Sequence, residues 1–161
     1  METKFNFKSS VCTSREQSRR LLALGLKPET ADMCHMPFRT KVNGEALDYT
    51  EHCSLPHGKD IPAWSLHRLI EMMPRTIKAN DDLFFLLVSK EDVFYDNTEG
   101  TAYSSFINRN GLYYNIILCI EWLIKEGYFN KEYLVDLTGT DSHQDMVDSF
   151  RYAFEALKKE D

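Results

Sequence analysis

The sequence lacks the patterns by which many enzymes are recognised. It holds no Gly-x-Ser-x-Gly nucleophile elbow, no glycine-rich phosphate loop, no dinucleotide-binding fingerprint and no His-Glu-x-x-His motif. Cys-x-x-Cys and His-x-x-x-His pairs, which are common in zinc sites, are also missing. These absences favour a noncatalytic protein. A small enzyme that uses a Cys–His pair is the least favoured of three functional interpretations.

Long hydrophobic runs and cysteines are also scarce. No apolar run reaches the roughly 20 residues that a membrane-spanning helix needs, and the first residues show no signal-peptide pattern. The 161 residues include four cysteines, which we interpret as reduced thiols rather than a disulfide framework. We therefore expect a cytoplasmic protein without a membrane partner.

Basic residues are in deficit. There are 19 Lys and Arg against 25 Asp and Glu, and the formal charge of -6 opposes nonspecific binding to nucleic acid. Residues 1–41 differ, because they carry 8 basic and 4 acidic side chains. If the chain presents a binding surface, its first candidates are Arg15, Arg19 and Arg20. A nucleic-acid-associated role that uses this basic N-terminal helix is the runner-up function.

The most prominent feature that is present is the apolar segment Leu112–Gly127. Of its first 13 side chains, 11 are apolar or aromatic, and only Asn115 and Glu121 interrupt them. An almost continuous apolar surface predicts a helix that is buried on most sides, and Gly127 is suited to end it in a left-handed conformation. We expect the rest of the chain to pack around this helix.

Short apolar runs before this helix predict an antiparallel meander. Turn residues separate the runs, so consecutive strands should pair. The predicted strands are residues 75–78, 83–88, 91–95 and 101–106. The strand 83–88 is apolar throughout, and it should be central in the sheet and covered on one face by the buried helix.

Helical patterns on both sides of the meander complete the predicted fold. Capping residues and apolar spacing predict helices at residues 14–24, 66–73, 130–137 and 141–157. The first should begin with a capping box formed by Thr13 and Glu16 and should end at Gly25. Together these elements indicate a single α+β domain over residues 1–161, in which residues 1–12 are a flexible arm or an edge strand.

Residues 33–62 are the least regular part of the sequence. A connection of this length is uncommon in a compact domain, so it is either a functional loop or contains a small hairpin near residues 38–50, with its turn at Asn43-Gly44. Its five potential metal ligands are Cys34, His35, His52, Cys53 and His57. They could hold a structural zinc ion. Their spacing matches no recognised zinc motif, so a polar loop without a cofactor is the preferred interpretation.

Three stretches, Thr13–Met33, Ile61–Pro74 and Ile120–Tyr128, resemble small proteins carried by phages and mobile elements of anaerobic gut bacteria. The similarity spans most of residues 13–135. This group has no assigned activity, so the resemblance implies no catalytic residues. It implies an accessory protein of the bacterial cytoplasm.

Tyr and Phe are abundant in the second half of the chain, and such residues are enriched where proteins meet. Packing in the core explains most of them, but a chain of this size without a catalytic motif more often binds than catalyses. We therefore expect a noncatalytic protein-binding or accessory protein whose partner is another protein. The sequence leaves the oligomeric state open.

Overall fold

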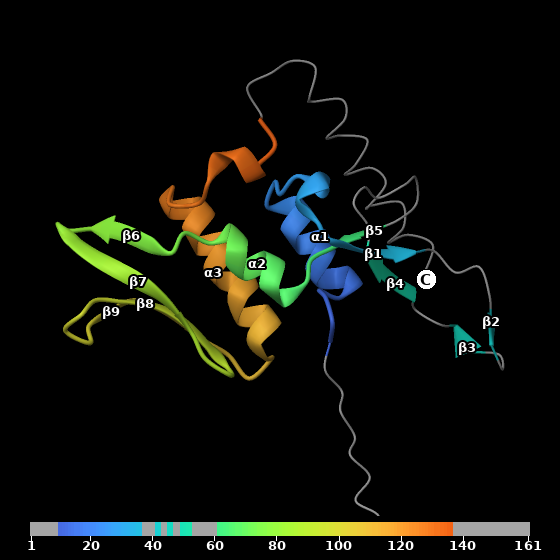
Figure 1. Ribbon diagram of the computed structural model, residues 1–161, viewed down its shortest axis with the longest axis horizontal. Coiled ribbons are helices and arrows are strands. Elements are labelled where there is room, and N and C mark those ends of the chain that lie inside the picture. Colours follow the sequence, from blue (N-terminus) through green and yellow to red (C-terminus); the bar gives the residue numbers. More distant parts are fainter. Residues whose placement is uncertain (1–9, 37–40, 43–44, 47–48, 53–60, 137–161) are drawn as a thin grey trace, which may run out of the picture.

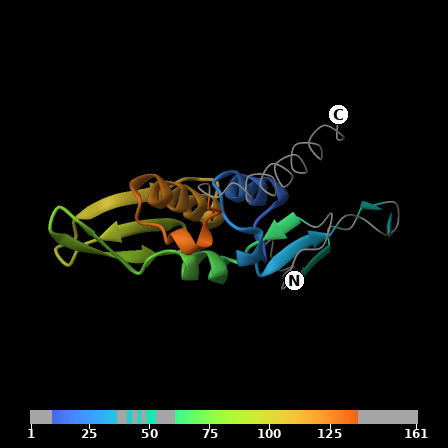
Figure 2. The same ribbon diagram turned by 90° about the horizontal axis from the view of Figure 1, so that it is seen from above.

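The computed structural model describes residues 10–36, 41–42, 45–46, 49–52 and 61–136. In this part of the chain, three helices lie between a larger and a smaller antiparallel sheet (Figure 1). A second view shows the same order, with the two sheets at opposite ends (Figure 2). These elements confirm the predicted α+β fold. No helix among the described residues is long and apolar enough to span a membrane.

The larger sheet is the predicted meander. Its strands, in spatial order, are β6 (Thr76–Ala79), β7 (Asp82–Val88), β8 (Asp92–Asp96) and β9 (Ala102–Ile107). All three pairings are antiparallel, and the apolar strand β7 lies inside the sheet, as expected. The turn from β6 to β7 is tight because Asn80 and Asp81 have φ angles of 50° and 69°, which Asn and Asp tolerate better than most residues.

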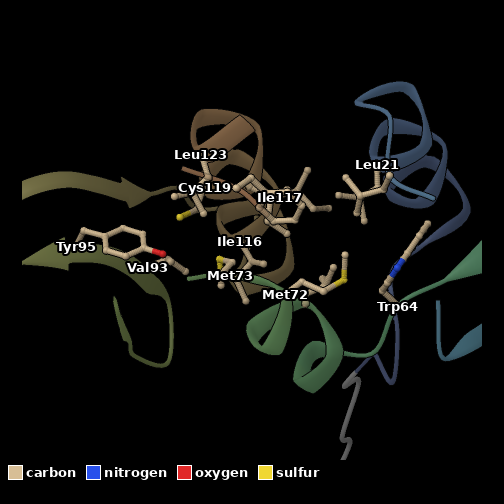
Figure 3. Packing of buried hydrophobic residues seen from close by; sticks show 14 of the residues in the cluster. Leu21, Trp64, Met72, Met73, Val93, Tyr95, Ile116, Ile117, Cys119 and Leu123 are labelled. Atoms are coloured by element: carbon tan, nitrogen blue, oxygen red, sulfur yellow. The ribbon is translucent and has the colours of Figure 1, made fainter. Parts of the chain in front are cut away.

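The helices are α1 (Arg15–Ala23), α2 (Leu66–Met72) and α3 (Leu112–Glu126). As predicted, α3 is the centre of the core. Its side chains that are at most 1% exposed are Asn115, Ile116, Ile117, Cys119, Ile120 and Leu123. Figure 3 shows four of these side chains among Leu21 of α1, Met72 of α2 and Val93 of β8; the four are Ile116, Ile117, Cys119 and Leu123. One helix thus joins the meander to the other two helices.

The aromatic side chains of the second half mostly belong to this packing. Trp122 on α3 has four aromatic neighbours, at ring-centroid distances of 6.0, 5.9, 5.7 and 5.8 Å. These neighbours are Tyr95, Tyr103, Phe106 and Tyr128. The cluster fixes α3 against β8 and β9, so these residues contribute to stability in the free protein.

Residues 33–62 contain more regular structure than the sequence predicted. Strand β1 (Met33–Met36) lies between β4 (Tyr49–His52) and β5 (Ile61–Ala63) in the smaller sheet. The strands β2 (Lys41–Val42) and β3 (Glu45–Ala46) pair with each other, which confirms the small hairpin. The alternative of an irregular loop is wrong for these strands. The strands β1, β4 and β5 escaped recognition because they are short and have no clear alternation of polar and apolar residues.

Helix α1 begins with a different capping box from the predicted one. Ser14 is the N-cap: its hydroxyl accepts from the Gln17 N–H at 3.2 Å, and the Gln17 side chain accepts from the Ser14 N–H at 2.9 Å. Thr13 and Glu16 do not form the box because the Thr13 hydroxyl is used elsewhere in the fold. The start of the helix was therefore misplaced by one residue.

Two glycines end helices where the sequence predicted. Gly25 follows α1 with φ of 91°, and the N–H of Leu26 reaches back to the carbonyl of Leu21 at 3.2 Å. Gly127 ends α3 with φ of 79°. A Cβ would strain the backbone at either position.

The predicted helix 130–137 is wrong. Asn130 caps only one 3-10 turn, Lys131–Tyr133, and Leu134 then pairs with Leu26 as an isolated bridge. The backbone after the turn bonds to the end of α1, with the Val135 N–H donating to the Gly25 carbonyl at 2.8 Å, instead of to its own preceding residues. The predicted helix 141–157 and residues 1–9 of the predicted arm lie outside the described residues.

Core burial around α3 yields a stability prediction. Ile120→Ala should lower the free energy of unfolding by about 2–5 kcal/mol, because the side chain is fully buried and leaves a cavity. Leu87→Ala removes as many carbon atoms from a side chain that is 44% exposed, and it should cost about 1 kcal/mol or less. Urea unfolding followed by circular dichroism measures both. Equal losses would contradict the central position of α3.

Candidate functional site

The most distinctive surface of the described chain is the face of the larger sheet that points away from α3. We call it the open face and define it by five apolar residues: Leu83, Phe85 and Leu87 of β7, Phe94 of β8 and Ile107 of β9. Four of them are well exposed, at 48% for Leu83, 37% for Phe85, 44% for Leu87 and 71% for Ile107. Figure 1 shows no element of the described chain on that side of the sheet.

The strand sequence explains why this face is apolar. Side chains alternate between the two sides of a strand. In β7, Leu83, Phe85 and Leu87 therefore point to the open side, and Phe84, Leu86 and Val88 point toward α3. The strand register then makes the open face continuous, because Leu87 stands opposite Phe94. A single helix cannot cover both sides of an apolar strand. The unbroken apolar run from Leu83 to Val88 is the sequence feature from which an exposed apolar face could have been predicted.

Charged residues flank the apolar centre of the open face in an uneven way. Lys78 of β6 stands opposite Leu83, and it is the only basic side chain at a strand position of this face. Asp92 and Asp96 lie on β8, on the other side of β7. Asp96 Oδ1 is buried and has no hydrogen-bond partner among the described residues. The face is thus basic toward one edge and acidic toward the other half.

The three arginines predicted to bind a partner lie on α1, but they do not share one environment. Arg20 pairs with Glu121 of α3 and lies over the ring of Tyr114 at 5.5 Å. The hydrogen bond that Arg20 donates to Glu121 raises the pKa of Arg20. Arg19 has a buried Nε, and Arg15 is half-buried. Arg20 therefore joins α1 to α3, while a binding role for Arg15, Arg19 and Arg20 stays a prediction.

The predicted zinc ligands are only partly described. Cys34 and His35 are adjacent and buried in β1, so their side chains point to opposite faces of the smaller sheet. His35 Nε2 lies 2.7 Å from the Thr13 carbonyl oxygen, and His52 stands opposite Met33 in the register. The remaining two, Cys53 and His57, lie outside the described residues.

The described part of the chain contains no group of three or more Cys, His, Asp or Glu that could hold a metal ion. Because two of the five predicted ligands lie outside that part, the zinc site stays a prediction.

A buried polar junction joins α1, α2 and the smaller sheet. The Thr13 hydroxyl lies 2.8 Å from the Ser18 hydroxyl and accepts from the Trp64 N–H at 3.0 Å. Asp32 accepts from both the N–H and the hydroxyl of Ser65, at 2.8 and 2.5 Å. Ser65 in turn caps α2. These groups satisfy one another, which is the arrangement of a structural network rather than of an open reaction centre.

The Cys119 thiol is poorly suited to nucleophilic chemistry. It is fully buried in α3, and this burial raises its pKa to about 12. Since the thiolate is the reactive form, its reactivity near neutral pH is suppressed. Cys119 therefore serves in the packing of the core.

Protein-family models, curated proteins and solved structures were all compared with this chain, and none of them matches it.

Burial of Cys119 predicts its labelling behaviour. At pH 8 on the order of one thiol in 10,000 is ionised when the pKa is about 12, so iodoacetamide should leave Cys119 unmodified in the folded protein. In concentrated urea the same thiol should react, because unfolding restores the ordinary pKa. Peptide mass spectrometry measures the modification. Equal rates in both conditions would show that the thiol is accessible.

The polar junction predicts a contrast between two substitutions of Thr13. Thr13→Val keeps the shape but leaves the Trp64 N–H and the Ser18 hydroxyl without their partner, so the free energy of unfolding should fall by about 1–3 kcal/mol. Thr13→Ser keeps the hydroxyl and should lose less. Urea unfolding compares the two, and a valine variant as stable as the serine variant would argue against this network.

Proposed function

We propose that this chain is a noncatalytic protein-binding domain and that the open face is its binding surface. The observation that carries the proposal is the joint exposure of Leu83, Phe85, Leu87 and Ile107 on one continuous side of the sheet. Contiguous exposed apolar surface of this kind marks interaction sites in folded proteins. The cytoplasmic setting in a bacterium that carries a mobile element belongs to the same proposal and rests on the sequence resemblance.

Burial energetics support this use of the face. Fully covering a Leu, Ile or Phe side chain contributes about 1.5–3 kcal/mol, and several half-exposed side chains together supply enough to hold a partner. The residues sit on β7, β8 and β9, whose backbones are fixed by neighbouring strands and by α3. A rigid surface loses little conformational entropy on binding.

The charge of the face supports a protein partner over nucleic acid. Lys78 is the only basic strand residue there, whereas Asp92 and Asp96 would repel phosphate groups. On α1, Arg20 is already paired with Glu121. A protein surface with apolar side chains and both signs of charge fits the open face better.

Site-specific photo-crosslinking in cells of the source organism tests this proposal. A benzophenone amino acid in place of Leu87 should give a discrete protein adduct. The same probe in place of His67, whose side chain is 84% exposed on α2, should not. Leu83→Asp should abolish the adduct, because it places a charge in the apolar face. Val11→Asp, a change at a residue 63% exposed outside the sheet, should preserve it.

Two results would contradict the proposal that the open face binds a partner. If the probe at residue 87 gives no adduct, or if Leu83→Asp leaves the adduct intact, the open face is not the binding surface. Circular dichroism of each variant confirms that the fold is retained, as expected for substitutions of exposed side chains.

A further inference from the structure

We propose that the partner is a second copy of this chain, and that two open faces pack against each other in a two-fold symmetric dimer. The inference rests on the proposed function, because it assigns the occupant of the same face. Two observations support it: the distribution of charge on the open face, and the place in the fold where the described chain ends.

The charges of the open face are complementary to those of the same face after a two-fold rotation. An axis parallel to the strands, lying between two such faces, places β7 of one copy over β8 of the other and β6 over β9. This rotation preserves the position of each residue along the strands. Lys78 pairs with Leu83, and Asp96 pairs with Phe85 two residues away, so Lys78 of one copy comes near Asp96 of the other. Every such contact occurs twice in an isologous interface.

In this arrangement a cation from the second copy would stabilise the Asp96 carboxylate. It stands opposite Phe85 on β7, and one of its carboxylate oxygens is buried without a hydrogen-bond partner among the described residues. A carboxylate that is partly shielded from water interacts more strongly with a nearby charge than a fully hydrated one. Lys78 of the second copy supplies that charge at the edge of the apolar contact.

The apolar residues are complementary under the same rotation. The register pairs Leu87 with Phe94 within one sheet, so the rotation places Leu87 of each copy over Phe94 of the other. An axis perpendicular to the strands would instead place β8 over β8 and bring acidic residues together. The charge pattern therefore selects the parallel axis.

The chain's own C-terminal residues are a less suitable occupant. Val135 hydrogen-bonds to Gly25 at the end of α1, and Leu134 pairs with Leu26. Helix α1 lies on the side of α3 away from the larger sheet (Figure 1). The described chain thus ends at residue 136 on the side of α3 away from the open face.

The size of the face predicts a weak dimer. With strands about 4.8 Å apart and about 3.3 Å per residue, a four-stranded face covers roughly 400 Å². A standard interface buries about 800 Å² per partner, so this face is about half of that size and we expect a weak dimer that forms only at high protein concentration. The protein should therefore shift between monomer and dimer over accessible concentrations.

Charge reversal combined with mixing tests the dimer. Lys78→Glu places Glu opposite Asp96, and Asp96→Lys places Lys opposite Lys78, so each variant alone should dimerise at least tenfold more weakly than the natural chain. An equimolar mixture of the two variants should associate again, because both contacts then join opposite charges. Sedimentation velocity over a concentration series measures each sample. Leu87→Asp should remain monomeric, and Val11→Asp should behave as the natural chain does.

The result that overturns the inference is a full-length chain that stays monomeric throughout the series. Dimerisation that is insensitive to both charge reversals, or a mixture that does not regain association, overturns it as well. A monomeric chain that still forms a crosslink from position 87 to a different protein leaves the proposed function standing. A crosslink within one chain to residues 137–161 would identify that segment as the occupant instead.

Discussion

Burial of α3 is the interaction on which the other elements depend. Its apolar side chains cannot be satisfied by one neighbour, so α1, α2 and the larger sheet each take part of its surface. In this packing α3 covers one side of the larger sheet, and a single helix cannot cover both sides. The exposed half of β7 follows directly from this arrangement, and so does the functional interest of the open face.

The sequence was most informative where one long or strongly patterned segment determines the structure. The apolar length of α3, the glycines at 25 and 127, and the cap at Ser65 act locally, so their effects could be recognised from neighbouring residues alone. The meander was predictable for the same reason, since each of its strands pairs with the next one along the chain.

Other features depend on residues that are distant in sequence. Thr13 lost its expected capping role because Trp64, 51 positions later, uses its hydroxyl. The strand β1 has partners that lie further along the chain, and the predicted helix at 130–137 gave way to hydrogen bonds with the end of α1. The open face was predictable only in part. The sequence predicted that the buried helix covers one side of β7, but whether another element covers the other side depends on the whole fold.

The larger sheet and α3 come from one uninterrupted stretch, residues 76–126, and Asn115 ties its connections together. Its side-chain amide donates to the carbonyls of Glu91 and Asn108, at 2.5 and 3.3 Å. Short connections cost little loop-closure entropy, and low contact order favours rapid folding. The contacts of this stretch thus form between segments that are close in the chain, whereas α1 and the smaller sheet depend on partners that are distant in the sequence.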